Sequence, residues 1–183
     1  MQPPDATTLP AELLAAVARL GVPLTPHLFA VRISTQTATL FESAGDGPRL
    51  LRTIPCSTSR FGIGQIKDSN QTPLGLHRIA EKIGDGEPIG MVFKARRPVG
   101  MEITGNPATA ITTRILWLEG LEPGLNRGGD VDTHDRYIYI HGTGDETKLG
   151  RPASCGCIHL AAADLIPLFD LLPSGTLVWI EKD

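Results

Sequence analysis

The spacing of apolar residues divides the chain into a short helical segment followed by a long run of strands. Pro10 begins and Gly21 ends a predicted helix, because proline suits a first helical turn and glycine suits a helix end. One side of this helix carries the apolar residues Leu13, Leu14, Val17 and Leu20. From residue 28 onward the apolar period becomes two, which is typical of strands.

The strands are predicted at residues 28–34, 37–43, 49–55, 89–93, 111–117, 137–141 and 177–181. A tight turn at Thr35-Gln36 joins the first two, and a second helix is expected over 161–172. Residues 56–88 are rich in Gly, Ser, Thr and Asn and are predicted to form a loop along the surface. We therefore expect a mainly β fold with peripheral helices: residues 1–26 form a short helical N-terminal segment, and residues 27–183 form a single β-sandwich or open-barrel domain.

Composition and charge narrow the function classes. The net charge of -3 shows no basic excess for nucleic acid or an anionic membrane surface. No stretch approaches the roughly 20 apolar residues that span a bilayer. The N-terminus lacks the basic and apolar regions of a secretory signal. The chain as written suits the cytoplasm, whereas removal of a leader would suit the periplasm or cell wall. The sequence does not indicate an oligomeric state.

Three cysteines, Cys56, Cys155 and Cys157, are an odd number, which argues against a closed disulfide framework. Cys155 and Cys157 are too close in an extended segment for an unstrained mutual bridge. At least one free thiol is therefore expected. Cys56 ends a predicted strand and is expected to pack in the core, whereas His77 and His134 are expected at the surface.

The segment 136–160, RYIYIHGTGDETKLGRPASCGCIHL, carries the candidate chemistry. A thiol becomes a strong nucleophile only as thiolate, so it needs a nearby base. His141 ends a predicted strand that can hold it still, and Cys157 follows Gly156 and precedes an apolar stretch read as a helix. Glycine permits a tight turn in which successive N–H groups converge on an oxyanion. Nucleophile, base and oxyanion donors together indicate acyl transfer.

This segment resembles the L,D-transpeptidase (YkuD-type) catalytic domain. The resemblance lies in HGT at 141–143, in Ser154-x-Gly156-Cys157-Ile158 and in the 16 positions from His141 to Cys157. TPLG at 72–75 and the closing strand GTLVWI extend it over residues 28–182.

The resemblance implies the following chemistry. Cys157 attacks the carbonyl of an L-residue that precedes a D-residue in a peptidoglycan stem peptide or related muropeptide, and forms a thioester. His141 deprotonates the thiol and is oriented by a backbone carbonyl at or near Gly142. The amides of Gly156 and Cys157 supply the oxyanion hole, and Ser154 braces the turn. No metal or organic cofactor is implied.

Two positions depart from the family pattern. Cys155 stands where the family usually has His, and His159 stands where it usually has Arg. Arg and His are not equivalent on a carboxylate, because only Arg offers a permanent charge on a planar fork. Both residues, together with Tyr139, are candidate substrate contacts, and Cys155 is alternatively a packing residue or a resolving thiol. His159 is alternatively a surface residue at the start of a helix.

Three other functions remain open. The same site would hydrolyse an L,D-peptide bond, as a carboxypeptidase or amidase does, if water is the acceptor. His141, Cys155, Cys157 and His159 are four ligands of the type that structural zinc takes. An inactive wall-binding module is the third alternative.

Overall fold

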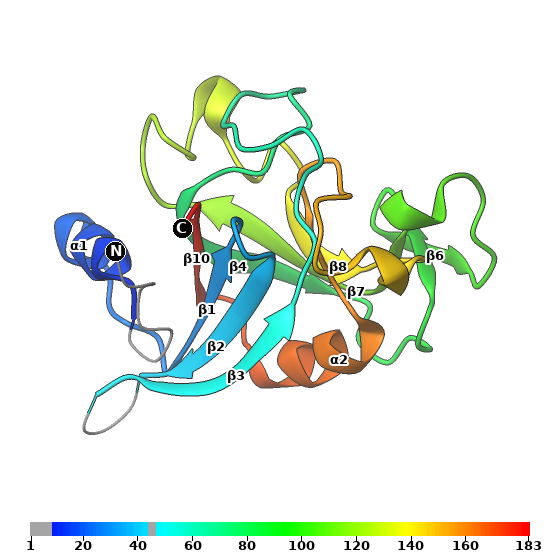
Figure 1. Cartoon of the computed structure of the whole chain (residues 1–183), viewed down its shortest axis with the longest axis horizontal. Helices are drawn as coiled ribbons and strands as arrows, with labels where there is room; N and C mark the ends of the chain where they lie inside the picture. The colour runs from blue at the N-terminus through cyan, green and yellow to red at the C-terminus, as the bar shows by residue number, and fades with distance from the viewer. Residues whose placement is uncertain (1–8, 44–46) are drawn as a thin grey trace.

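Ten strands form one mixed sheet, and two α-helices pack against it (Figure 1). The structure, a computed structural model, describes residues 9–43 and 47–183; residues 1–8 of the predicted N-terminal segment lie outside it. The strands are β1 (His27–Arg32), β2 (Thr37–Glu42), β3 (Arg49–Pro55), β4 (Gly75–Ile83), β5 (Val92–Lys94), β6 (Arg97–Gly100), β7 (Ile111–Gly120), β8 (Tyr139–Gly142), β9 (Ile158–Leu160) and β10 (Leu177–Glu181). The helices are α1 (Ala11–Leu20) and α2 (Ala162–Leu171), with 3₁₀ turns η1 (Pro107–Thr109), η2 (Gly129–Val131) and η3 (Glu146–Lys148).

The strand order is β3-β2-β1-β10-β4-β7-β5-β6, and β8 branches from β7 to pair with β9. The pairs β1–β10 and β8–β9 are parallel, and the other pairs are antiparallel. The mainly β class with peripheral helices is therefore confirmed. No helix within the described ranges is long and apolar enough to cross a bilayer.

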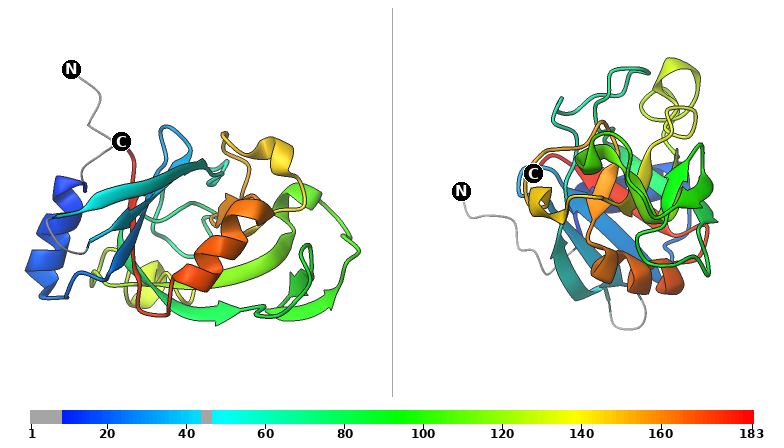
Figure 2. Two further views of the ribbon diagram at one scale, coloured as in Figure 1. Left: turned by 90° about the horizontal axis from the view of Figure 1, so that it is seen from below. Right: turned by 90° about the vertical axis from the view of Figure 1, so that its right-hand side faces the viewer.

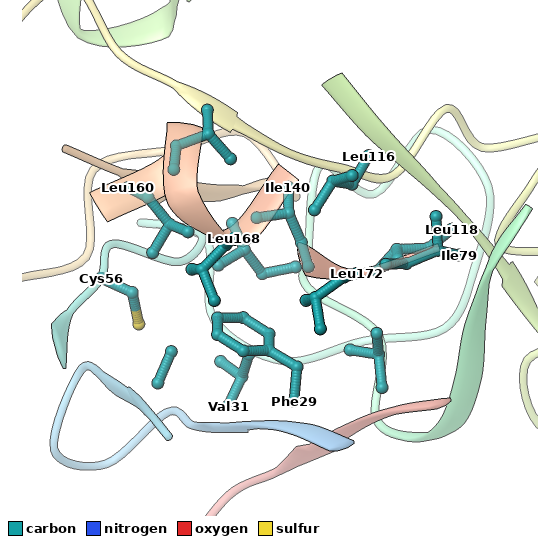
Figure 3. Close-up of a cluster of buried hydrophobic side chains, with 14 of the residues drawn as sticks. Phe29, Val31, Cys56, Ile79, Leu116, Leu118, Ile140, Leu160, Leu168 and Leu172 are labelled. Carbon is teal, nitrogen blue, oxygen red and sulfur yellow. The ribbon is translucent and has the colours of Figure 1, made fainter. Parts of the chain in front are cut away.

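Alternation along the strands places apolar side chains on both faces of the sheet. On β1, Phe29 and Val31 join a core that α2 covers, whereas Leu28 and Ala30 join a second cluster with α1. The two helices accordingly lie on opposite sides of these strands (Figure 2). Figure 3 shows the α2 core, in which Leu168 and Leu172 meet the strand residues. Cys56 lies in this core, as predicted.

Helix α1 begins and ends where the sequence predicts. Gly21 adopts a left-handed conformation with φ 63°, and Val22 N–H donates to the Val17 carbonyl at 3.2 Å, which closes the last turn. Leu13 and Val17 are buried, but Leu14 is 41% exposed. The apolar face of the helix is thus narrower than predicted.

The predicted surface loop 56–88 is wrong in two ways. Residues 75–83 form β4, a central strand between β10 and β7. Residues 57–59, Ser-Thr-Ser, are buried although they are polar, because their hydrogen-bonding groups find partners inside the protein. For example, Gln36 Nε2 donates to Thr58 Oγ1 at 2.7 Å, and Ser59 N–H donates to Thr72 Oγ1 at 3.0 Å.

The stretch after Cys157 also differs from the prediction. Residues 158–160 form β9, and α2 begins only at Ala162. The predicted strand 89–93 is shifted to 92–94, and the hairpin partner β6 was not predicted. A three-residue strand such as β9 carries too few positions for an apolar period to distinguish it from the helix that follows.

Candidate active site

The parallel pairing of β8 with β9 sorts the candidate residues onto one face of the sheet. The register places Ile140 opposite Ile158 and His141 opposite His159. Ile140, Ile158 and Leu160 belong to the α2 core. Neighbouring residues along a strand point to opposite faces, so the residues next to these core positions lie on the other face. They are Tyr139, His141, Cys157 and His159.

His141 is fully buried and is held by its own neighbour. Its Nδ1 lies 2.7 Å from the Gly142 carbonyl oxygen, which only accepts hydrogen bonds. Nδ1 therefore carries the proton, and Nε2 has the free lone pair of a general base. Burial lowers the pKa of His141 to about 4, although the Gly142 hydrogen bond opposes this shift. The imidazole is neutral near pH 7.

Position 142 requires a glycine because β7 passes close to its Cα. A Cβ at this position would lie 2.8 Å from both the carbonyl oxygen and Oγ1 of Thr112. A larger residue would push β8 away from β7 and shift the carbonyl that orients His141.

The Cys157 thiol is half-buried and makes two hydrogen bonds with β8 and the residues just before it. Sγ donates to the Tyr137 carbonyl at 3.5 Å and accepts from Tyr139 N–H at 3.4 Å. Burial raises the pKa of Cys157 to about 12, Tyr139 N–H and the Arg136 charge lower it, and the neighbouring Cys155 raises it.

His141 is not among the hydrogen-bond partners of Cys157 in the described residues. It is the diagonal neighbour of Cys157 on the same face, because His159 lies directly opposite His141. The resting site thus contains a neutral thiol and a neutral imidazole on adjacent positions. Such contacts are often long in unliganded sites and tighten with substrate.

The turn that presents Cys157 is fixed by two hydroxyl groups. Ser154 Oγ donates to the Cys157 carbonyl at 2.6 Å and accepts from Gly156 N–H at 3.2 Å. Gly156 has φ +119°, a conformation that other residues rarely adopt. Thr72 Oγ1 donates to the Gly156 carbonyl at 3.0 Å. Thr72 of the TPLG element therefore braces the turn before Cys157, a role that the sequence did not reveal.

The two amides predicted as oxyanion donors differ in their hydrogen bonds. The Gly156 amide already donates to Ser154. The Cys157 amide donates to no atom in the described part of the chain. It is the free N–H beside the sulfur.

His159 is only 2% exposed, so its prediction as a surface residue at a helix start is wrong. Its ring centroid lies 4.6 Å from that of His141. Burial, together with His141, lowers the pKa of His159 to about 2. Its Nδ1 is buried and finds no hydrogen-bond partner in the described residues. A neutral, enclosed imidazole cannot supply the charge of the arginine that the family usually has here.

The other two predicted substrate contacts lie in different environments. Tyr139 is 4% exposed and packs edge-on against Trp117, with ring centroids 5.5 Å apart. Its hydroxyl accepts from Arg96 at 3.5 Å. Cys155 is exposed and lines a cavity of about 120 Å³.

Two histidines outside the site were predicted at the surface. His77 is instead fully buried, with Nδ1 2.9 Å from the Gly75 carbonyl and Nε2 3.1 Å from Thr133 Oγ1. Burial lowers its pKa to about 4. His134 stacks on Trp117 at 3.9 Å. Neither residue lies on the β8–β9 face.

Sequence reasoning missed two arginines near the site. Arg96, at the tip of the β5–β6 hairpin, lies over the rings of Trp117 and Tyr137 at 4.7 and 5.2 Å. Arg136 directly precedes Tyr137, and its charge reaches Cys157. No sequence motif marked either residue. Across the described ranges, no three His, Cys, Asp or Glu side chains form a metal-binding cluster, so the four proposed zinc ligands do not converge.

A model of the L,D-transpeptidase catalytic domain (YkuD) matches residues 26–180. The chain belongs to this family. No curated protein matches the chain.

Solved structures show that the fold is shared with L,D-transpeptidases. LdtMt1 in complex with imipenem is 19% identical with a TM-score of 0.52, and the match covers 85% of this chain and 59% of that one. L,D-transpeptidase 3 from Mycobacterium tuberculosis, in complex with a faropenem-derived adduct, is 16% identical with a TM-score of 0.52, covering 86% and 60%. Bd1075 of Bdellovibrio bacteriovorus is 17% identical with a TM-score of 0.56, covering 86% and 48%. The chain thus spans about half to three-fifths of the length of these structures.

Proposed function

We propose that this protein catalyses acyl transfer on a peptidoglycan-type stem peptide, with Cys157 as nucleophile and His141 as general base. The observation that carries the proposal is the shared face of β8 and β9. On it, the lone pair of a carbonyl-oriented imidazole and a half-buried thiol occupy adjacent positions. Membership of the L,D-transpeptidase family supplies the substrate class. We assign the catalytic unit to residues 27–183.

The reaction proceeds through a thioester. Sγ attacks the carbonyl carbon of the L-residue, and its proton passes to His141 Nε2. The Cys157 N–H donates to the developing oxyanion. The C–N bond to the D-residue breaks, and the leaving amine takes the proton from His141. An acceptor amine then attacks the thioester and loses its proton to His141. The sulfur leaves as thiolate and recovers that proton.

The neutral resting state determines when the proton moves. Burial raises the pKa of Cys157 and lowers that of His141, so both groups favour their neutral forms before substrate binds. The proton therefore leaves sulfur during the attack, when the bound substrate excludes water and the oxyanion forms. His159 then supports His141 as a neutral neighbour rather than as a substrate contact.

The test is turnover of a defined tetrapeptide with an L–D bond before its last residue. Mass spectrometry should find a cross-linked product when an amine acceptor is present. Cys157→Ala should lower turnover on the order of 10³-fold or more. Cys155→Ser is the matched control and should retain most activity, because it keeps the shape of the exposed side chain and removes only a sulfur that the mechanism does not use.

The products also show whether the acceptor is an amine or water. Cleaved tripeptide alone, with acceptor present, would identify a hydrolase instead of a transferase. Unchanged turnover in Cys157→Ala would reject the nucleophile assignment.

A further inference from the structure

The site lacks a cation two positions after Cys157, where His159 stands. His159 is enclosed and neutral, as its burial and the adjacent His141 require. A peptide with a free carboxylate next to the scissile bond still needs a positive partner, because a carboxylate that leaves water unpaired is costly to bind. The cation must come from another element.

Arg136 is the cation beside the sulfur. It directly precedes Tyr137, whose carbonyl accepts from the Cys157 thiol. The Arg136 charge is close enough to lower the pKa of that thiol against the larger effect of burial. The residue is half-buried, so its interaction with a bound anion is screened less than at the open surface.

One arm of the guanidinium is hydrogen-bonded to the protein and the other is not. Nη2 donates to the Gln71 carbonyl at 2.7 Å and lies 3.4 Å from Ser69 Oγ. Nη1 is buried and has no hydrogen-bond partner in the described residues. An unpartnered buried donor on a permanent cation is costly in the free protein, and a ligand oxygen would satisfy it.

Arg136 lines the same cavity as Cys155. The cavity measures about 120 Å³, and its lining is Lys67, Asp68, Asn70, Asp135, Arg136, Tyr137, Ile138 and Cys155. Within the described residues, neither Lys67 nor Arg136 has a carboxylate within 4.0 Å. A cavity of this volume can hold several waters or one small charged group.

We propose that Arg136, with Lys67 beside it, binds the free carboxylate of the D-residue that follows the scissile bond. This inference rests on the proposed function. A residue spans about 3.5 Å of extended chain, so a carboxylate on the leaving residue lies within one residue of the attacked carbonyl. The cavity is lined by Tyr137, whose carbonyl accepts from the Cys157 thiol. Arg136 thereby determines which peptides the enzyme accepts, and Asp68 and Asp135 disfavour a second negative charge.

The experiment compares two tetrapeptides that differ only at the last residue, a free acid and its carboxamide. The wild-type protein should use the acid with a kcat/KM about 10- to 100-fold higher, as expected for one charge-assisted pair. Arg136→Gln should reduce this ratio toward one by lowering kcat/KM for the acid, mainly through KM. Arg136→Lys should keep part of the preference, since it retains the charge without the fork.

The ratio distinguishes recognition from damage to the fold. Loss of the Gln71 hydrogen bond would slow both peptides equally and leave the ratio unchanged, which would overturn the proposal. Arg49→Gln removes one charge from an exposed arginine paired with Glu42 and should leave the ratio at the wild-type value.

Two further outcomes separate this inference from the proposed function. Equal use of acid and amide by the wild-type protein would overturn the carboxylate site and leave the Cys157 chemistry standing. Loss of the preference in Arg96→Gln but not in Arg136→Gln would place the anchor on the β5–β6 hairpin and also overturn it. If the wild-type protein turns over neither peptide, both proposals fail.

Discussion

The two faces of the β8–β9 pair share one backbone and have opposite properties. One face contributes Ile140, Ile158 and Leu160 to the core under α2. The other face carries His141, Cys157 and His159, each one position away from a core residue. The difference shows that packing of one face in the core holds the strands in place, and with them the side chains on the opposite face. Rigid strands hold a site more accurately than loops do.

The buried histidines should make the protein sensitive to acid. His141 and His159 on this face, and His77 on β4, are buried and have lowered pKa values. In the unfolded chain these three imidazoles bind protons as the pH falls below about 6.5, whereas in the folded protein they stay neutral. The free energy of unfolding is therefore highest above that pH and decreases below it. At about 1.4 kcal/mol per pH unit for each group, the loss is roughly 4 kcal/mol per pH unit between pH 6 and 4.5.

Urea denaturation at a series of pH values measures this slope. His77→Gln should reduce the slope by about a third, whatever it does to stability at pH 7. A free energy of unfolding that stays constant from pH 7 to 5 would show that these imidazoles are not buried in neutral form.

Substitutions at adjacent positions of β8 should separate activity from stability. His141→Gln keeps most of the side-chain volume but removes the base, and turnover should fall about 10²- to 10⁴-fold. Ile140→Ala should instead cost about 2–5 kcal/mol of stability, as core deletions do, and leave the folded enzyme active. Turnover and urea denaturation of both variants provide the comparison. Loss of stability without loss of turnover in His141→Gln would reverse the assignment of the two faces.

The smallest effect is expected at the turn that presents Cys157. Thr72→Val keeps the shape but removes the hydrogen bond to the Gly156 carbonyl. We expect a loss of about 1 kcal/mol of stability and a several-fold decrease in kcat. Thr39→Val, on the exposed β2–β3 surface, is the matched control and should change neither quantity measurably. An unchanged kcat in Thr72→Val would show that TPLG does not support the site.

Local patterns predicted α1, α2, most strands and the His141–Cys157 segment. The apolar period, the helix caps and the motif spacing that predict them all depend on residues close together in the sequence. The pairing of β8 with β9 joins residues 18 positions apart, and no local pattern contains it. For this reason the sequence does not predict β9, and it leaves His159 open between a substrate contact and a surface residue at a helix start. β4 was hidden by its outward-facing charges, among them Arg78, which pairs with Glu119. The cavity at Arg136 arises from loops that meet only in the folded protein.

The most direct test of the central claim is covalent trapping by a carbapenem, followed by peptide mapping. A reactive sulfur at residue 157 predicts one adduct per chain, attached to the peptide at Cys157, and no adduct in Cys157→Ala. In His141→Gln the adduct at Cys157 should form much more slowly. An adduct on Cys155 that persists in Cys157→Ala, or the absence of any adduct on the folded protein, would contradict the account.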